Sequence, residues 1–228
     1  MKIIAFTFAG GSRYSFHNIT KNIENFIVIE YPGRGTRMNE EMISDIDLLT
    51  GDLLQKVKNE ISSDEDYIIY GHSMGALMGY LVCHRIEELG LPKPVKLVVS
   101  GKKPPVVKRE KLFSQLPDKL FWDEVVKIGG VPDELLNYNE LIEFYTPILK
   151  TDFAVIEKYQ YRKKNKLSVP IDVFYGSEES DEDEMQEWKE ESDKKVSITQ
   201  MGGDHFFIFK HINFFTQYFK DLTQKVTV

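Results

Sequence analysis

The stretch that decides the fold is residues 67–76, which read YIIYGHSMGA. Its first four residues are apolar or aromatic and predict a short buried strand, and apolar residues at helical spacing continue from Ala76 to about Leu89. Between the two lies a G-x-S-x-G motif centred on Ser73, which in a strand–turn–helix context lifts a serine hydroxyl above the end of a sheet. The start of the helix offers free N–H groups to a developing negative charge. The sequence therefore predicts that Ser73 is a nucleophile.

Short apolar runs recur on both sides of this motif and alternate with helical patterns. Such alternation is typical of parallel β-α-β units whose sheet is covered on both faces. The predicted fold class is therefore α/β, with a mainly parallel central sheet flanked by helices. Further strands are expected at 2–8, 26–31, 95–100, 169–175 and 196–201, and further helices at 46–61 and 212–222.

One long segment breaks the alternation, because residues 108–160 show helical signals and no strand. Leu116-Pro117-Asp118 and Val131-Pro132-Asp133 each resemble a helix start, with proline near the first turn. The segment is much longer than a crossover needs. We therefore expect a single domain, residues 1–228, with a helical lid inserted at about 106–160. The alternative is that these helices simply pack on a face of the sheet.

The composition of the 228-residue chain excludes several classes of protein. Its formal net charge is -7 and it has no basic stripe with interleaved aromatic residues, so a nucleic-acid partner is not expected. Cys83 is the only cysteine, which rules out an internal disulfide and a cysteine metal cluster. No apolar run approaches the ~18 residues of a membrane helix, and residues 1–6 lack the pattern of a signal peptide. We expect a cytoplasmic monomer with no membrane partner.

A serine hydroxyl is a poor nucleophile unless a base lies within hydrogen-bond reach. In α/β-hydrolases, the fold that these elements predict, the acid and then the histidine follow the serine along the chain. Three histidines follow Ser73: His84 in the next helix, His211 at the start of the last helix, and His205 in the loop after the last strand. That loop lies at the carboxyl edge of a parallel sheet. His205 is therefore the predicted base, and His72 is expected to be structural.

The acid that orients the histidine should lie in the loop after the strand at 169–175. That loop, residues 176–182, reads GSEESDE and contains several carboxylates, most of which are expected to be solvated. We favour Glu179, with Asp181 as the alternative, because the residues alone do not choose between them. No metal is needed for this chemistry.

The negative charge on the substrate oxygen requires two backbone donors. One is expected from Met74, the residue after the nucleophile, and the other from a glycine-rich loop after an early strand. Residues 8–12, FAGGS, form that loop, in which Ala9 is the first choice and Gly10 the second. The loop does not fit either of the common glycine-rich phosphate-binding motifs.

A resemblance to a known family is carried by residues 8–12 (FAGGS), 31–35 (YPGRG), 70–76 (YGHSMGA), 100–105 (SGKKPP), 129–132 (GGVP), 147–153 (PILKTDF) and 203–207 (GDHFF). In these segments the chain resembles the type II thioesterases that accompany nonribosomal peptide and polyketide synthases. This family usually has an aspartate three residues after the glycine that ends the penultimate strand, and here that position is Glu179, so Asp181 stays open as the acid. The resemblance runs nearly from end to end of the chain.

The resemblance implies hydrolysis of an acyl or aminoacyl thioester on the phosphopantetheine arm of a carrier protein. That reaction removes wrong or stalled groups and so regenerates the synthase. The implied partners are acyl or peptidyl carrier protein domains, and no cofactor is implied beyond the arm that carries the substrate. Lys102, Lys103, Lys108 and Arg109 are candidates for contact with an acidic carrier, although a solvated run is the simpler interpretation.

Two other functions stay open. The first is a chain-releasing thioesterase of a fatty acid or polyketide system, which differs in substrate and not in mechanism. The second is a carrier-protein-binding module with weakened catalysis, for which the replaced acid is the only support. A lipase or carboxylesterase is disfavoured by the lid segments.

Overall fold

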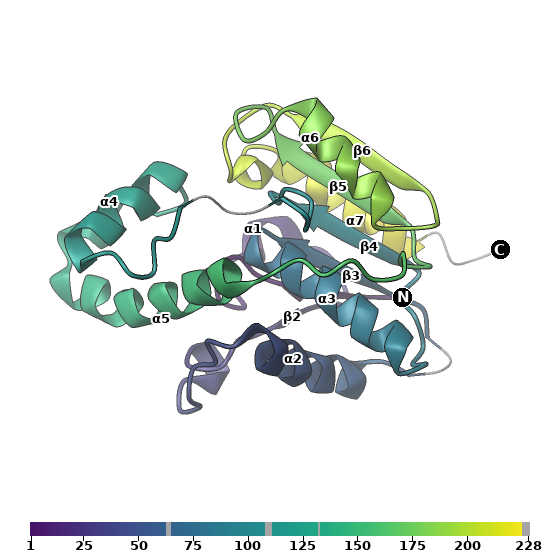
Figure 1. Ribbon diagram of the computed structural model, residues 1–228, viewed down its shortest axis with the longest axis horizontal. Coiled ribbons are helices and arrows are strands. Elements are labelled where there is room, and N and C mark those ends of the chain that lie inside the picture. Colours follow the sequence, from purple (N-terminus) through teal and green to yellow (C-terminus); the bar gives the residue numbers. More distant parts are fainter. Residues whose placement is uncertain (63–64, 108–110, 132, 225–228) are drawn as a thin grey trace.

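The computed structural model describes residues 1–62, 65–107, 111–131 and 133–224, which form an α/β fold (Figure 1). Parallel strands make one sheet: β1 (Lys2–Phe6), β2 (Phe26–Ile29), β3 (Tyr67–His72), β4 (Lys96–Ser100), β5 (Ile171–Gly176) and β6 (Val196–Met201). Their order is β2-β1-β3-β4-β5-β6, so the strand before the predicted elbow lies inside the sheet. The predicted fold class is confirmed.

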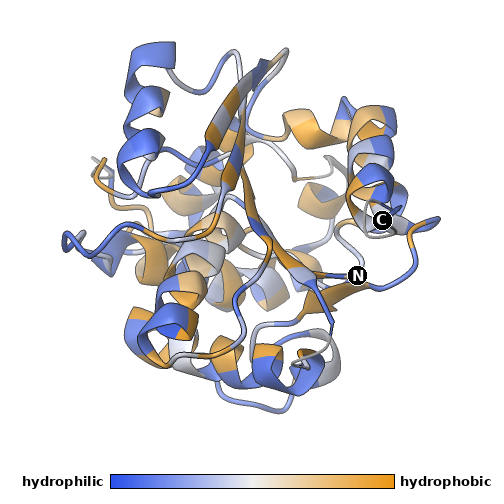
Figure 2. Ribbon diagram, turned by 90° about the vertical axis from the view of Figure 1, so that its right-hand side faces the viewer, coloured by the Kyte–Doolittle hydropathy of each residue, from blue (hydrophilic) through white to orange (hydrophobic). Residues whose placement is uncertain are grey.

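Helices cover both faces of this sheet. On one face lie α2 (Ile46–Glu60), α3 (Met74–Glu88), α6 (Glu182–Gln186), η3 (Glu187–Glu190) and the end of α5 (Asn139–Lys158). On the other lie α1 (His17–Thr20), η4 (Phe207–Phe209) and α7 (Ile212–Gln224). Figure 2 shows mostly orange, apolar strands between helices that carry both colours, as expected for helices with one buried side. The remaining elements are η1 (Gly35–Arg37), α4 (Asp118–Ile128) and η2 (Asp133–Asn137).

Successive residues of the inner strands contribute to two separate apolar cores. In β1, Ile4 and Phe6 belong to the core beneath α2 and α3, whereas Ile3 and Ala5 belong to the core beneath α7. Side chains of a strand point to alternate faces, so a strand that is buried on both faces must be apolar at every position. This is why β1 and the first half of β3 appear in the sequence as unbroken apolar runs.

The structure corrects the predicted boundaries around the elbow. The strand predicted to end at Tyr70 continues to His72, and the helix predicted from Ala76 begins at Met74. Gly71 and His72 pair with β4 in the sheet, and hydropathy does not reveal them because one is glycine and the other polar. Ser73 is thus the single residue between strand and helix. The predicted strand at 2–8 is also shorter, ending at Phe6.

The helical segment between β4 and β5 has an apolar cluster of its own. α4 and the first part of α5 project to one side of the sheet, at the left of Figure 1. Trp122 and Val125 of α4 pack there against Leu149 and Phe153 of α5. Further along α5, Val155 belongs to the core on the sheet. α5 is therefore continuous from the projecting cluster into the body of the molecule.

Within the described ranges, no helix has both the length and the apolar character that crossing a membrane requires.

Candidate active site

Ser73 lies on a strained turn that only its glycine neighbours permit. Its φ of 57° is left-handed, a conformation that side chains other than glycine rarely adopt. A Cβ on Gly71 would lie 2.0 Å from the carbonyl oxygen of Gly75, and a Cβ on Gly75 would lie 2.0 Å from that of Phe6. Both contacts are with backbone, which cannot move aside. The two glycines of the motif are therefore required by the close approach of β1, β3 and α3.

His205 joins Ser73 to a carboxylate. Its Nε2 atom lies 2.9 Å from Ser73 Oγ, and its Nδ1 atom is hydrogen-bonded to Oε1 of Glu179. The other carboxylate oxygen of Glu179 accepts the N–H of Gly176 at 3.1 Å. The three side chains come from the ends of β3, β5 and β6, which meet at the carboxyl edge of the sheet. This is the arrangement in which a histidine can accept a proton from a serine.

Asp181, the alternative acid, lies apart from this line of side chains. It is the residue before α6, its side chain is exposed, and its carbonyl accepts the N–H of Met185. Glu179 is half-buried and turns back toward its own strand, because its N–H donates to the carbonyl of Gly176 at 3.0 Å. The turn brings the longer glutamate side chain to His205.

A second serine–histidine pair lies beneath the site. Nδ1 of His72 is 2.9 Å from Oγ of Ser100, which is also 3.0 Å from the hydroxyl of Tyr70. All three residues are fully buried, and burial together with the nearby His205 holds the pKa of His72 well below its usual value. A neutral, buried pair of this kind has no access to a substrate. Its place is structural, as expected for His72.

The other two histidines that follow Ser73 lie elsewhere. His84 is buried within α3, where burial lowers its pKa to about 4. His211 lies before α7, and its Nε2 atom donates to the carbonyl of Gly202 at 2.8 Å. His205 is the histidine that contacts Ser73.

Two backbone N–H groups near Ser73 have no partner among the described residues. One belongs to Met74 and the other to Ala9 in the loop after β1. The neighbouring donors of that loop are engaged, since Gly10 donates to Oδ2 of Asp152 at 2.7 Å and Gly11 donates to the carbonyl of Phe8 at 2.9 Å. Free N–H groups beside a nucleophile can stabilise an oxyanion.

A cavity of about 270 Å³ opens on Ser73 and His205. The glycine-rich loop forms one wall, and the projecting helices α4 and α5 form the other. The described residues that line it include no lysine, arginine, aspartate or glutamate. Most of its wall is apolar, and it is contributed by Phe8, Trp122, Val125, Ile128, Val131, Leu135, Leu149, Phe153 and Phe206.

Comparison with known proteins is consistent with this geometry. The sequence profile of the thioesterase domain family matches residues 1–225. The chain belongs to this family. Members of the family are thioester hydrolases, so the cavity beside Ser73 belongs to an enzyme of that class.

Individual relatives of this thioesterase come from biosynthetic pathways. The protein named "Probable anguibactin biosynthesis thioesterase AngT", from Vibrio anguillarum, is 31% identical over 229 residues, which cover 96% of this chain and 90% of that protein. The crystal structure of ClbQ from the colibactin NRPS/PKS pathway has a TM-score of 0.87 at 30% identity and covers 98% of this chain and 95% of that one. YbtT, a type II thioesterase from the yersiniabactin NRPS/PKS pathway, has a TM-score of 0.84 at 28% identity, covering 96% and 91%.

The basic residues that were candidates for carrier contact are only partly described. In the thioesterase, Lys103 forms an ion pair with Glu184 at 2.7 Å, and the carbonyl of Lys102 accepts the indole N–H of Trp188. Lys108 and Arg109 lie outside the described residues. The ion pair of Lys103 fits the simpler interpretation, a solvated charged surface.

Two buried residues beside the site were not among the site residues predicted from the sequence. Arg34 of the YPGRG segment and Asp152 of α5 form a buried ion pair that also binds the loop containing Ala9. The signal that could have indicated Asp152 is its place on a helix between Leu149 and Phe153, both of which are apolar and buried. A carboxylate in such a position requires a partner.

Proposed function

We propose that this thioesterase is an editing, type II enzyme that removes acyl or aminoacyl groups from the phosphopantetheine arm of carrier proteins in a nonribosomal peptide or polyketide synthase. The observation that carries the proposal is the hydrogen-bonded line from Ser73 through His205 to Glu179, which opens on a small apolar cavity. ClbQ and YbtT, which are 30% and 28% identical and belong to NRPS/PKS pathways, support the choice of substrate.

In the proposed reaction, Ser73 is the nucleophile and His205 the general base. Nε2 of His205 accepts the hydroxyl proton while Ser73 Oγ attacks the thioester carbonyl carbon. The C–S bond then breaks, His205 protonates the leaving pantetheine thiolate, and an acyl-enzyme is left. A water molecule activated by His205 attacks this ester and releases the carboxylic acid. Glu179 holds the tautomer of His205 that has its proton on Nδ1, and it stabilises the imidazolium formed in each step.

The oxyanion formed in both steps is assigned to the N–H groups of Ala9 and Met74. The assignment of Ala9 rather than Gly10 is supported by the neighbouring hydrogen bonds, because the N–H of Gly10 is already donated to Asp152. Removal of one such donor typically costs about 3–4 kcal/mol of transition-state stabilisation. Each step uses only this chain, water and the substrate, so the proposal includes no cofactor.

We further propose that residues of about 106–160 act as a lid within a single α/β-hydrolase domain. The support is that α4 and α5 supply one wall of the cavity while their apolar cluster lies apart from the sheet. The partners are acyl or peptidyl carrier proteins, whose pantetheine arm must enter beneath this wall. The protein is expected to act as a monomer in the cytoplasm.

The size and lining of the cavity predict its acyl preference. We expect acetyl groups on a carrier to be removed faster than dodecanoyl groups, because about 270 Å³ is below the ~300–1,000 Å³ of typical small-molecule pockets. We expect malonyl groups to react at least about tenfold more slowly than acetyl groups, since the one free carboxylate of the malonyl group would be buried without a cationic partner. Mass spectrometry of the three loaded carriers gives the rates.

The same panel separates the proposal from its rivals. Dodecanoyl as the fastest substrate would favour a chain-releasing thioesterase. If no group were removed and a fluorophosphonate failed to label Ser73, the carrier-binding module would replace the enzyme. Labelling of wild type but not of Ser73→Ala, with acetyl fastest, is the result that the editing function predicts.

A further inference from the structure

A buried ion pair connects α5 to the loop after β2. The guanidinium of Arg34 donates from both terminal nitrogens to the two carboxylate oxygens of Asp152, each at 2.6 Å. Arg34 is 4% exposed and Asp152 2% exposed, so the pair is almost fully removed from water. The Cζ atom of Arg34 also lies 5.1 Å from the centroid of the Tyr31 ring. A buried ion pair is weak evidence for stability, because the cost of removing both charges from water offsets much of their attraction.

The carboxylate accepts from a third donor, which belongs to the loop that lines the cavity beside Ser73. Oδ2 of Asp152 also accepts the N–H of Gly10 at 2.7 Å, across 142 residues of sequence. One turn earlier in α5, the Leu149 side chain packs so closely that a Cβ on Gly10 would lie 2.6 Å from it. A hydrogen bond to an ionised acceptor is shorter and stronger than one between neutral groups. Asp152 therefore anchors the backbone of the glycine-rich loop to α5.

The peptide groups on both sides of Ala9 are each fixed by one hydrogen bond. The N–H of Gly10 belongs to the peptide group that follows Ala9, and Asp152 fixes its orientation. The carbonyl of Phe8 belongs to the peptide group that precedes Ala9, and the N–H of Gly11 fixes it at 2.9 Å. The Ala9 N–H shares a rigid plane with that carbonyl. Its direction is therefore set by two hydrogen bonds, one of which ends on Asp152.

We propose that Asp152 is a positioning residue for the oxyanion hole, with Arg34 holding its carboxylate in place. Asp152 does not touch the substrate. Its carboxylate binds the N–H of Gly10, so that this donor is not available to the oxyanion. The same hydrogen bond helps to orient the N–H of Ala9 toward the position where the thioester oxygen becomes negative. This inference rests on the proposed function, because it requires that Ser73 form a tetrahedral adduct.

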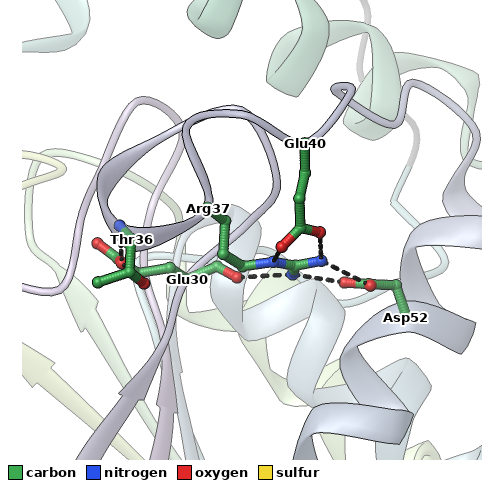
Figure 3. Close-up of polar contacts among 5 residues, drawn as sticks. All are labelled: Glu30, Thr36, Arg37, Glu40 and Asp52. Atoms are coloured by element: carbon green, nitrogen blue, oxygen red, sulfur yellow. Dashed lines mark hydrogen bonds and ion pairs between the residues drawn. The ribbon is translucent and has the colours of Figure 1, made fainter.

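The chain offers a matched control in a second arginine–aspartate pair of the same loop. Arg37 donates to both oxygens of Asp52 at 2.7 and 2.8 Å, and it is also held by Glu40 and by the carbonyl of Glu30 (Figure 3). Asp52 lies on α2 and makes no hydrogen bond to the glycine-rich loop within the described residues. Asp52→Asn therefore removes the same chemical interaction without touching Ala9 or Gly10.

Two ligands separate the oxyanion hole from binding in general. One is pantetheine with a trifluoroacetonyl group on sulfur, and the other is the corresponding trifluoro-2-hydroxypropyl alcohol. Ser73 Oγ adds to the ketone carbon, the carbonyl π pair becomes the oxyanion, and the serine proton moves to His205. The alcohol fills the same space but cannot form the adduct. The ratio of their dissociation constants measures stabilisation of the oxyanion.

In Asp152→Asn the amide NH₂ would face a terminal nitrogen of Arg34, from which it cannot accept, so the side chain must shift. We therefore expect the ratio to fall about ten- to a hundredfold, because a small misplacement of one oxyanion donor removes much of its stabilisation. The alcohol should bind as it does to wild type, and kcat should fall with KM little changed. Asp52→Asn should keep the wild-type ratio even if its melting temperature falls. Arg34→Gln, which keeps the carboxylate but removes its partner, should show a smaller loss and provides the test if Asp152→Asn does not fold.

The outcomes are distinct. If the ratio in the folded Asp152 or Arg34 variant equals that in Asp52→Asn, the pair is only structural and the inference is wrong. If wild type itself fails to prefer the ketone to the alcohol, the proposed serine chemistry is wrong, and the role of Asp152 falls with it.

Discussion

Replacement of His205 by Ala is expected to lower kcat for acetyl-pantetheine by about 10⁵- to 10⁶-fold, a loss similar to that seen when the histidine base of a serine hydrolase is removed. Nε2 of His205 is 2.9 Å from Ser73 Oγ, and no other histidine in the described residues contacts that hydroxyl. Without it the serine keeps its proton and the leaving thiolate has no acid. The rate of thiol release, followed with a thiol-reactive dye, gives kcat.

His211→Ala is the matched control for this variant. His211 also follows β6, but its ring donates to the carbonyl of Gly202 and lies outside the cavity lining. Its replacement should leave kcat within about threefold of wild type, since surface substitutions rarely change free energies by more than ~0.5 kcal/mol. A His205→Ala protein that is folded and still hydrolyses thioesters at the wild-type rate would remove His205 from the mechanism.

Glu179→Gln is expected to lower kcat by about 10⁴-fold, the loss seen when an acid of this kind becomes an amide. The reason lies in the second hydrogen bond of Glu179. Because Oε2 accepts the N–H of Gly176, the single oxygen of a glutamine would turn to that donor. Its NH₂ group would then face Nδ1 of His205 and favour the tautomer with the proton on Nε2. That tautomer cannot accept the proton of Ser73.

The matched control here is Asp181→Asn. Asp181 is exposed, precedes α6 and is not the carboxylate that contacts His205. Its replacement should leave kcat nearly unchanged. Measurements of kcat for both variants, with circular dichroism to verify folding, decide between the two acids. A large loss in Asp181→Asn together with a small one in Glu179→Gln would show that the loop takes a different arrangement during the reaction.

The elbow and the α/β class of the fold could be predicted because their signals are local. An apolar run, two glycines around a serine and an apolar helix lie within consecutive residues, and each follows from one physical requirement. The same holds for His205, whose loop comes directly after the last strand. The boundaries at Gly71 and His72 were missed because a buried strand can carry glycine and histidine when the neighbouring backbone requires them.

The choice of acid depends on a turn that the sequence does not specify. The loop of residues 176–184 offers carboxylates at six positions, and composition treats them alike. In the structure, the hydrogen bond from the N–H of Glu179 to the carbonyl of Gly176 turns this one side chain toward His205. The N–H groups of Ser177 and Glu178 also donate to the carbonyls of Met201 and Gly203, so the arrangement of this loop depends on contacts with a distant part of the chain.

The ion pair between Arg34 and Asp152 could not be predicted from the sequence, for a different reason. The two residues are 118 positions apart, and they meet only because α5 returns from the projecting cluster to the sheet. The preference for Ala9 over Gly10 depends on the same contact, since it is Asp152 that occupies the N–H of Gly10. Long-range contacts of this kind cannot be read from spacing or periodicity in a single sequence.

The most direct test of the proposed function is the intact mass of an acetyl-loaded carrier protein after incubation with wild type and with Ser73→Ala. If the proposal is correct, wild type removes the acetyl group and restores the mass of the free phosphopantetheine form, whereas the variant leaves the loaded mass unchanged. If Ser73→Ala removed the group as fast as wild type, or if wild type removed it from none of several carriers, carrier editing through Ser73 would be contradicted.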